Sequence, residues 1–453
     1  MDFLPPLPGE GRGGGKRRSM WSAEAEPAPL APIPTFPRKG KEQDTRKDTV
    51  MQRRELLKRM AAAPLAGAAG QLMAAPAAEG AKLLVVFLRG AYDCTSLLVP
   101  TASDFYYASR PSIAIARPGQ PNGALPLDGT WGLHPALAPS VMPLFQQKQA
   151  SFIAFAGTDD LTRSHFETQD SIELGQALDR RRDYRSGFLN RLAGVLGAGP
   201  VADVSPIAFT DQLPIALRGD AKAANMALAG VARAGIDARQ SQVITAMYRH
   251  TPLAQPVAEG FQVRDEVMRA VQAEMDAASR NAMSAKGFEL VARRMALLMR
   301  DRFDLGFVDI GGWDTHVGQG AAIGYLANRF EELGRGVAGF AQEMGDDAWR
   351  QTVVVVISEF GRTFRENGNR GTDHGHGTVY WVLGGGLSAQ AGGRIVGEQQ
   401  ALTQATLFQN RDYPVLNEYR AVFGGLFKRM YGLSPAQLAR VFDGVAPKDL
   451  QLV

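Results

Sequence analysis

Five runs of apolar residues along the chain have the length and composition of buried β-strands. They are KLLVVFL (82–88), SFIAFAG (151–157), FVDIGG (307–312), TVVVVIS (352–358) and TVYWVLGGG (378–386). Continuous apolar runs rich in β-branched residues and ended by glycine or polar residues are typical of strands covered on both faces. The pattern therefore predicts a sheet that is buried between two layers.

Helical patterns alternate with these strands. They cover residues 134–149, roughly 241–300, and 324–344. Such alternation predicts an α/β fold with a doubly wound, mostly parallel sheet. We expect residues 81–453 to form a single domain, in which the helix-rich segment at about 215–300 is an insertion or cap rather than part of the sheet.

The first fifty residues do not have the pattern of a folded segment. They are rich in proline, glycine and charge and lack a sustained apolar period, which predicts a disordered extension. Met51 is an alternative start that would leave residues 1–50 untranslated.

Residues 51–80 resemble a twin-arginine export signal. Arg53, Arg54, Lys58 and Arg59 precede an Ala/Gly-rich apolar stretch, and the small residues at 74–78 offer a cleavage site. The resemblance predicts transfer by the twin-arginine export machinery to a periplasmic or secreted location. The alternative is a basic amphipathic leader helix with no role in export.

Composition and charge exclude several classes of protein. The net charge is +4, but the first 80 residues hold 13 of the 50 basic and 9 of the 46 acidic residues, which leaves 37 of each for the remainder. A neutral body argues against nucleic-acid binding, which needs clustered Lys and Arg. The lone Cys94 excludes an internal disulfide framework. No later segment has ~18 consecutive apolar residues, so we expect no transmembrane segment in the mature chain.

Polar clusters follow or precede each predicted strand. They are RGAYDCTS (89–96), GTDDLTRSHFETQD (157–170), GGWDTH (311–316), SEFGRT (358–363) and GTDHGHG (371–377). Functional residues of doubly wound folds gather where loops leave the carboxyl ends of the strands. We therefore expect the five clusters to converge on one edge of the sheet.

Two of these clusters combine carboxylate and imidazole side chains. Asp314 and His316 lie in one, and Asp373, His374 and His376 lie in the other. Mixed oxygen and nitrogen ligands favour one or two divalent ions of zinc, manganese or iron over magnesium or calcium. The alternative is that each Asp/His pair is only a hydrogen-bonded loop pair.

Two further carboxylates end buried strands and are open to two interpretations. Glu359 is either a metal ligand or the ion-pair partner of Arg362, and Asp93 at the end of the first strand has the same two alternatives. Cys94 is expected to be a small buried apolar residue rather than a nucleophile.

The cluster TRSHFETQD has the pattern of a helix start. Ser164 with Glu167 three residues later forms a capping box, which by itself indicates only a well-capped helix. A hydroxyl at a helix N-terminus also lies at a natural anion site, and a metal can activate it as a nucleophile. Ser164, or else Thr162, is the candidate nucleophile, and Arg163 and His165 could bind or protonate the leaving group.

Together these motifs resemble the bacterial domain-of-unknown-function family 1501 (DUF1501). The resemblance rests on FLRGAYD, GLHPAL, TRSHFETQD, GGWDTH, SEFGRT, GTDHGHG, DYPVLNEYRAVFGGLF and VFDG. It implies an alkaline-phosphatase-like α/β core with one or two metals and a hydroxyl nucleophile.

Position by position, the resemblance assigns roles to individual residues. Asp93 would be the first-strand aspartate, Ser164 or Thr162 the nucleophile, Asp314 and His316 the ligand pair after the middle strand, and His374 or His376 the final histidine ligand. Ser358 to Gly361 would match a Ser-Asp-His-Gly strand end. Phe360 stands where that pattern has a histidine ligand, which puts a complete two-metal site in doubt.

The sequence thus supports two functional hypotheses. The first is an exported metal-dependent hydrolase of small-molecule or polymeric phosphate or sulfate esters, in which Arg163 or Arg362 stabilises charge on the non-bridging oxygens. The second is a catalytically degenerate protein of the same fold that binds a ligand or an exported partner.

Overall fold

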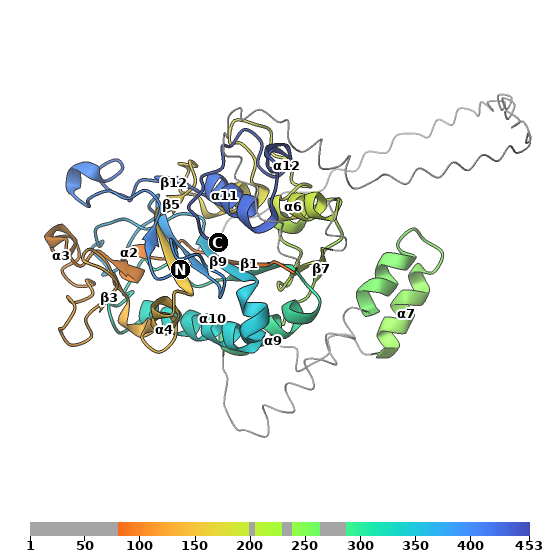
Figure 1. Ribbon diagram of the computed structural model, residues 1–453, viewed down its shortest axis with the longest axis horizontal. Helices are drawn as coiled ribbons and strands as arrows, with labels where there is room; N and C mark the ends of the chain where they lie inside the picture. The colour runs from red at the N-terminus through yellow and green to blue at the C-terminus, as the bar shows by residue number, and fades with distance from the viewer. Residues whose placement is uncertain (1–79, 199–203, 229–237, 263–286) are drawn as a thin grey trace, which may run out of the picture. The chain divides into compact units, whose positions relative to one another are not determined.

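A computed structural model of the chain describes residues 80–198, 204–228, 238–262 and 287–453 (Figure 1). The predicted extension (1–50) and nearly all of the predicted export signal (51–80) lie outside the described residues. Within the described ranges, no helix is long and apolar enough to cross a membrane.

A nine-stranded sheet forms the centre of the described fold. Its strands are β1 (Lys82–Leu88), β5 (Ala150–Gly157), β6 (Pro206–Ala208), β7 (Ala224–Asn225), β8 (Leu305–Ile310), β9 (Thr352–Ser358), β10 (Thr378–Leu383), β11 (Ile395–Val396) and β12 (Asn417–Glu418). The spatial order is β11-β5-β10-β9-β1-β8-β6-β7, and β12 pairs with β5. Only β10 runs antiparallel to its neighbours β5 and β9. The prediction of an α/β fold with a mostly parallel sheet, including all five strands, is confirmed.

Alternate residues of β1 face the two layers that cover the sheet. Leu84, Val86 and Leu88 belong to one apolar cluster, and Leu83, Val85 and Phe87 to the other. Each of these side chains is at most 1% exposed. The continuous apolar run in the sequence reflects this burial on both sides.

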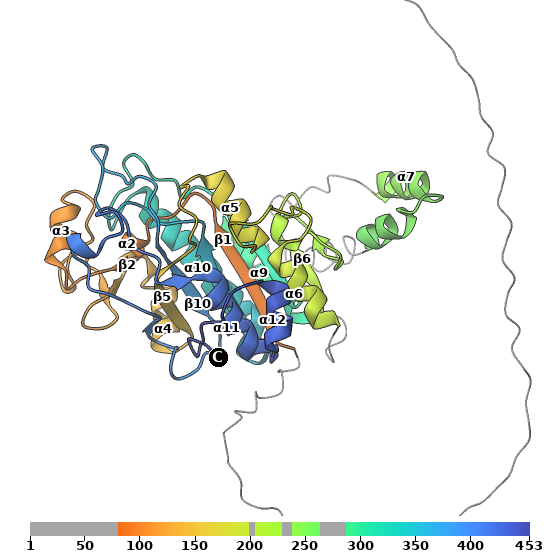
Figure 2. The same cartoon turned by 90° about the horizontal axis from the view of Figure 1, so that it is seen from above.

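Helices form both layers, as Figures 1 and 2 show. One layer contains α4 (Val141–Gln146), α9 (Phe288–Asp301) and α10 (Tyr325–Arg350), and the other contains α6 (Phe188–Gly197), α11 (Tyr419–Tyr431) and α12 (Pro435–Val441). Further helical segments are α2 (Cys94–Leu97), α3 (Asp104–Ser109) and α5 (His165–Leu174), together with the 3-10 turns η1 (Pro135–Leu137), η2 (Ile215–Leu217) and η3 (Gln404–Thr406). A small second sheet pairs β2 (Leu98–Val99), β4 (Gly132–Leu133) and β3 (Leu125–Pro126).

The helices differ from their predicted ranges for local reasons. The predicted helix 134–149 is split into η1 and α4, because Pro139 between them has no N–H to continue the hydrogen-bond ladder. The predicted helix 324–344 is confirmed as α10, which continues past a break at Gly345, where φ is 71°.

The segment 215–300, predicted to be a helical insertion, contains the helix α7 and also two elements, β7 and α9, that belong to the main fold. Its helix α7 spans Ala238–Tyr248. The strand β7 is part of the central sheet and α9 packs against α10, so both ends of the segment belong to the main fold. Sequence reasoning did not identify β7 because it is only two residues long.

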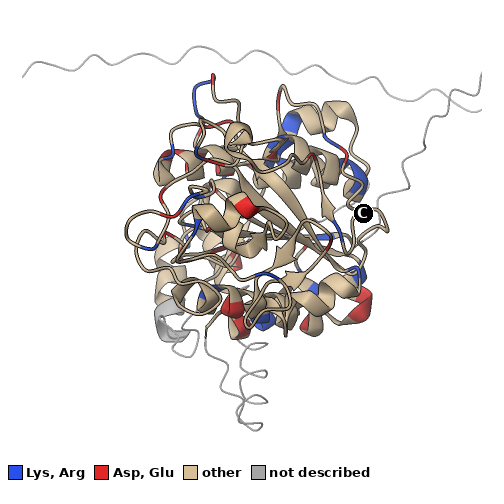
Figure 3. Cartoon of the chain, turned by 90° about the vertical axis from the view of Figure 1, so that its left-hand side faces the viewer, with Lys and Arg blue, Asp and Glu red and all other residues tan. Residues whose placement is uncertain are grey.

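Charged residues of both signs are interspersed over the face of the chain seen in Figure 3. This agrees with the balance of acidic and basic residues after position 80.

Burial of His134 makes stability depend on pH. Burial lowers its pKa from 6.5 to about 4, its Nδ1 accepts from the Ala136 N–H, and its Nε2 contacts the Ala321 carbonyl. As the pH falls below 6.5, the unfolded chain protonates this imidazole, whereas the folded chain does so only near pH 4. The unfolded state binds more protons in that window, so acidification destabilises the fold.

We expect His134 to account for a loss of about 2 kcal/mol in unfolding free energy between pH 7 and pH 5. Denaturant titrations at both pH values should show this loss in the wild type and a shallower dependence in His134→Asn. His250 is exposed, so His250→Asn is the control. A dependence that is equal in all three proteins would contradict the assignment.

Candidate metal centre

The sheet topology brings the polar clusters to one edge. Strands β1, β5, β8 and β9 run parallel, so the residues after Leu88, Gly157, Ile310 and Ser358 leave the sheet at the same end. Because β10 is antiparallel to β9, the loop 371–377 before its start reaches that edge too. Figure 2 shows α5 at this end of β1.

Two of the loops are joined directly by backbone hydrogen bonds. The Gly375 N–H donates to the Gly361 carbonyl and the Gly361 N–H to the His376 carbonyl, each at 2.8 Å. A Cβ on Gly375 would lie 2.5 Å from the Arg362 backbone carbon. The glycine thus allows the close approach that places His374 next to Arg362.

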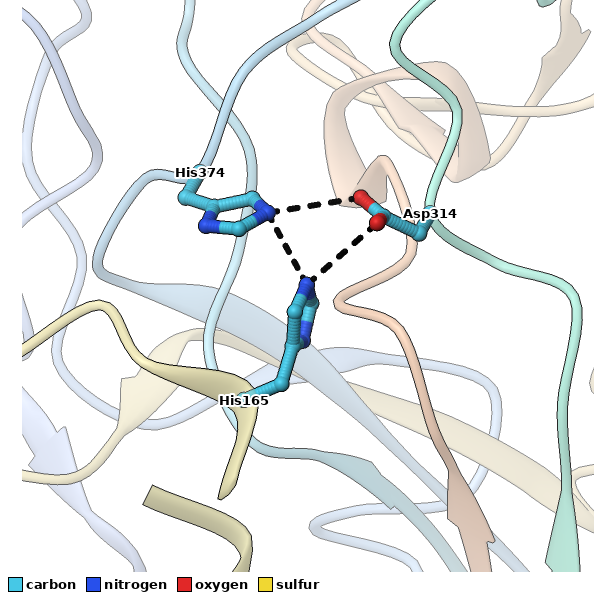
Figure 4. Close-up of side chains that lie close together, drawn as sticks. All are labelled: His165, Asp314 and His374. Atoms are coloured by element: carbon cyan, nitrogen blue, oxygen red, sulfur yellow. Dashed lines mark hydrogen bonds and ion pairs between the residues drawn. The ribbon is translucent and has the colours of Figure 1, made fainter. Parts of the chain in front are cut away.

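Three side chains converge at this edge (Figure 4). His165, Asp314 and His374 each offer one ligand atom, and these atoms all lie within 4.8 Å of one another. His165 Nε2 is 2.9 Å from His374 Nε2 and 3.5 Å from Asp314 Oδ2. The group therefore has the composition and spacing of a metal-binding site.

His316 adds a fourth group beside this cluster. Its Nε2 lies 2.9 Å from Asp314 Oδ1 and 3.1 Å from His374 Nε2. Its side chain is 40% exposed, so this side of the centre is open to solvent.

Each of the three imidazoles is oriented through its Nδ1. His165 Nδ1 contacts Glu359 Oε1 at 2.7 Å, His316 Nδ1 contacts Asp373 Oδ1 at 3.1 Å, and His374 Nδ1 contacts the Arg163 carbonyl at 3.0 Å. Carboxylate and carbonyl oxygens can only accept, so in the neutral ring the proton is on Nδ1 and the Nε2 lone pair points inward. Metal-binding histidines almost always have such an acceptor behind them.

The donor set therefore fits a divalent cation. When the three rings are neutral and carry their protons on Nδ1, Nε2 atoms 2.9 and 3.1 Å apart place lone pairs against one another. A cation between these atoms relieves that repulsion, and imidazole with carboxylate suits zinc, manganese or iron.

Arg362 and burial set the ionisation of the carboxylates. Burial would raise the pKa of Asp314, but the hydrogen bond from Arg362 Nη1 at 2.6 Å and its charge outweigh burial and hold that pKa below its usual value. Burial likewise opposes ionisation of Glu359, whose pKa is nevertheless lowered by hydrogen bonds from His165 and Gln169. Both carboxylates are thus ionised at neutral pH.

The pKa values of the paired histidines shift in opposite directions. The hydrogen bond to Glu359 raises the pKa of His165, whereas burial and the neighbouring charge of His165 lower the pKa of His374. In the absence of metal, a proton shared between the two Nε2 atoms belongs mainly to His165. Metal binding would displace that proton.

The structure places several predicted residues outside this group. Asp93 caps α2 and forms a fully buried ion pair with Arg110. Burial and the charge of Arg163 lower the pKa of His376 to about 4, and its Nδ1 has no partner among the described residues. Glu359 and Asp373 act on the histidines rather than lying in the three-residue group.

Arg163 and Arg362 each form an ion pair with a carboxylate. Arg163 has φ of 52°, donates to Asp412 and Gln409, and points its carbonyl at His374. Arg362 is 1% exposed and donates to Thr372 as well as to Asp314. In this arrangement Arg163 positions His374 and Arg362 positions Asp314, two members of the candidate metal-binding group.

The two candidate nucleophiles lie at the start of α5. Ser164 Oγ accepts from the Glu167 N–H at 3.4 Å, and Thr162 Oγ1 contacts Thr168 Oγ1 at 3.2 Å. The predicted N-cap is thus confirmed, although the reciprocal Glu167 bond is not among the described hydrogen bonds. Because His165 follows Ser164 directly, the hydroxyl and the cluster lie at the same helix end.

Sequence reasoning missed two supporting residues. Gln169 Nε2 donates to Glu359 at 2.8 Å, and Asn367 Nδ2 donates to Asp373 at 3.0 Å. Gln169 lies inside TRSHFETQD one turn after His165, and this spacing was the available signal. Asn367 lies in a loop with no distinguishing pattern.

Comparison with known families agrees with this picture. The model of the family "Protein of unknown function (DUF1501)" matches residues 81–442, so the chain belongs to that family. A search of curated proteins finds no match to this chain.

Glu359→Gln tests the role of the carboxylate that contacts His165 Nδ1. The amide can still accept from His165 but carries no charge, so we expect metal affinity to fall roughly tenfold. Competition with a chromogenic chelator measures this, with Glu398→Gln, at a 63% exposed side chain, as the control. An affinity equal to that of the control would show that Glu359 does not support the centre.

Proposed function

We propose that this protein is an exported, metal-dependent hydrolase of phosphate or sulfate esters, with an alkaline-phosphatase-like core. The observation that carries the proposal is the convergence of inward-facing Nε2 atoms and an ionised carboxylate at the N-terminus of a helix capped by a hydroxyl. The twin-arginine-like segment supports a periplasmic or secreted location.

His165, His374, Asp314 and the adjacent His316 would hold one ion of zinc, manganese or iron. When bound, such an ion polarises an ester oxygen and lowers the pKa of a nearby hydroxyl. Arg362 keeps Asp314 ionised, and Glu359, Asp373 and the Arg163 carbonyl fix the three imidazoles.

Ser164 is the preferred nucleophile and Thr162 the alternative. The serine Oγ attacks phosphorus or sulfur, the bond to the alcohol oxygen breaks, and the serine proton leaves with the alcohol. Water then hydrolyses the serine ester and releases phosphate or sulfate. The N-terminal end of α5 favours the anionic group electrostatically.

The test combines metal analysis with an activity panel. We expect the purified mature chain to hold a stoichiometric transition metal, His316→Ala to hold less, and the wild type to hydrolyse aryl phosphates or sulfates. Ser164→Ala should then reduce kcat at least about a hundredfold, with Thr162→Ala as its matched comparison. A wild-type protein without metal after growth in metal-replete medium would refute the mechanism.

One observation favours the second hypothesis, a metal-binding protein without turnover. Both candidate hydroxyls are engaged at the helix start, and no described hydrogen bond joins either to the three-residue group. A stoichiometric metal without turnover of any phosphate or sulfate ester, together with a stable ligand or exported partner recovered by pull-down, would support that function.

A further inference from the structure

Asp412, the first residue of DYPVLNEYRAVFGGLF, is a buried carboxylate that lies outside the three-residue metal group. Its side chain is 0% exposed, and its Oδ2 accepts from Arg163 Nη2 at 2.8 Å. Arg411 Nη1 contacts both carboxylate oxygens at 3.1 Å. Aspartate is almost never fully buried unless it is paired in this way, so the burial of Asp412 depends on these arginines.

The backbone of Asp412 is fixed relative to the candidate metal centre. Its N–H donates to the Phe408 carbonyl at 3.0 Å, and the Phe408 N–H donates to the Asp412 carbonyl at 2.8 Å. Asp412 also forms an antiparallel β-bridge with Thr363. Thr363 directly follows Arg362, whose side chain contacts Asp314, so the carboxylate is anchored beside the loop that supports this ligand.

Arg163 has a backbone conformation that residues other than glycine rarely adopt. Its φ of 52° lies in the left-handed region, and the next residue, Ser164, is extended and caps α5. The carbonyl of Arg163 lies 3.0 Å from His374 Nδ1. A left-handed arginine persists only where its surroundings hold it, so the position of this carbonyl depends on the contacts that Arg163 makes.

Two side chains hold Arg163 in this conformation. Its Nη2 donates to Asp412 Oδ2 at 2.8 Å and to Gln409 Oε1 at 2.7 Å. Gln409 is exposed, so water competes with its hydrogen bond, whereas the Asp412 carboxylate is shielded from solvent and carries a charge. Asp412 is therefore the stronger of the two anchors.

The Arg163 carbonyl determines which nitrogen of His374 carries the proton. A carbonyl can only accept, so the neutral ring keeps its proton on Nδ1, and the Nε2 lone pair faces His165 and His316. If the Arg163 backbone relaxed, its carbonyl would turn away and the tautomer with the proton on Nε2 would become accessible. That tautomer has no Nε2 lone pair with which to bind a cation.

We propose that Asp412 is a positioning residue for the metal centre. Through the Arg163 side chain, it holds the left-handed backbone whose carbonyl fixes His374 as the tautomer protonated on Nδ1. The inference rests on the metal centre of the proposed function, but it does not depend on ester hydrolysis.

The tautomer of His374 can be measured by NMR in the metal-free full chain labelled with ¹⁵N-histidine. The chain has six histidines, and the signal that disappears in His374→Asn identifies this one. The wild type should show the proton on Nδ1. Asp412→Ala should move part of the population to Nε2, and Asp412→Asn, which keeps the shape of the side chain, should do so to a smaller extent.

Asp449→Asn is the control, because Asp449 is 42% exposed and pairs with Arg429 outside the candidate centre. It should give the wild-type tautomer. A wild type with the proton of His374 on Nε2, or a tautomer that is unchanged in both Asp412 variants, would overturn the proposed role of Asp412.

Metal affinity gives a second readout, measured by competition with a chromogenic chelator. Asp412→Ala should weaken binding roughly tenfold, the lower end of the loss typical of residues behind metal ligands. Arg163→Ala should have a similar effect, and the double variant should lose no more, because Asp412 acts through Arg163. Additive losses, or wild-type affinity in Asp412→Ala, would contradict this role. A wild type that binds no metal would refute the proposed function, and the tautomer of His374 would still decide the role of Asp412.

Discussion

Replacing His374 with alanine is expected to remove the metal from the protein. His374 Nε2 contacts His165, His316 and Asp314. Its replacement therefore removes the candidate ligand atom that lies next to all three of the others. Removal of an outer partner typically costs 10–100-fold in affinity, and loss of a direct ligand should cost more than about 100-fold. Metal content measured by plasma mass spectrometry should fall from one ion per chain to below about a tenth.

His376→Ala is the matched control for this variant. It removes an imidazole from the same loop, two residues away, that lies outside the three-residue group. We expect it to retain the metal, and thermal unfolding of both variants verifies that they fold. Full metal content in His374→Ala, or equal loss in both variants, would show that the cluster is not the site.

Replacing Arg110 with methionine is expected to destabilise the fold by about 3–5 kcal/mol. The Asp93–Arg110 pair is bidentate, at 2.5 and 3.0 Å, and both side chains are 0% exposed. Burial opposes ionisation of Asp93, but Arg110 outweighs it and keeps the pKa of Asp93 below its usual value. Without Arg110, the buried carboxylate of Asp93 loses its counter-charge, and the Thr363 and Phe364 carbonyls lose the donors that Arg110 supplies.

Arg117→Met is the control, because Arg117 and Asp104 form an exposed pair with side chains 46% and 96% exposed. Such pairs contribute at most about 1 kcal/mol. Denaturant unfolding should also show that the double variant Asp93→Asn with Arg110→Met recovers part of the loss. Equal stability of Arg110→Met and Arg117→Met would refute a structural role for the buried pair.

Asp93 illustrates how far a motif can be interpreted without coordinates. The sequence left it open between a ligand and an ion-pair partner, and the partner, Arg110, lies 17 positions away in a segment with no signal of its own. Gln319 and Thr372 connect Asp93 to Arg362, so the pair supports the Asp314 loop indirectly. Such contacts depend on how loops cross one another, which local pattern does not specify.

The convergence of the polar clusters was easier to predict from the sequence than the partner of Asp93. The apolar runs located the buried strands in the sequence. Because parallel strands end at the same edge of a sheet, the residues that follow them were expected to meet there. The histidines of WDTH and GTDHGHG were therefore expected near one another. His165 was expected to act on the leaving group, and that role stays a prediction; the structure adds that its Nε2 lies within the candidate metal-binding group.

By itself, the sequence determined the fold class, the five long strands, the family and the edge at which the polar loops gather, because apolar runs and strand–helix alternation are local properties. Only the tertiary structure decided which side chains face inward. That choice depends on contacts between residues up to about two hundred positions apart, such as His165 with His374 and Glu359. The cavity of about 960 Å³ that Arg89, Leu290 and Ile310 help to line is likewise a product of the tertiary structure, because its walls come from segments that are distant in the sequence.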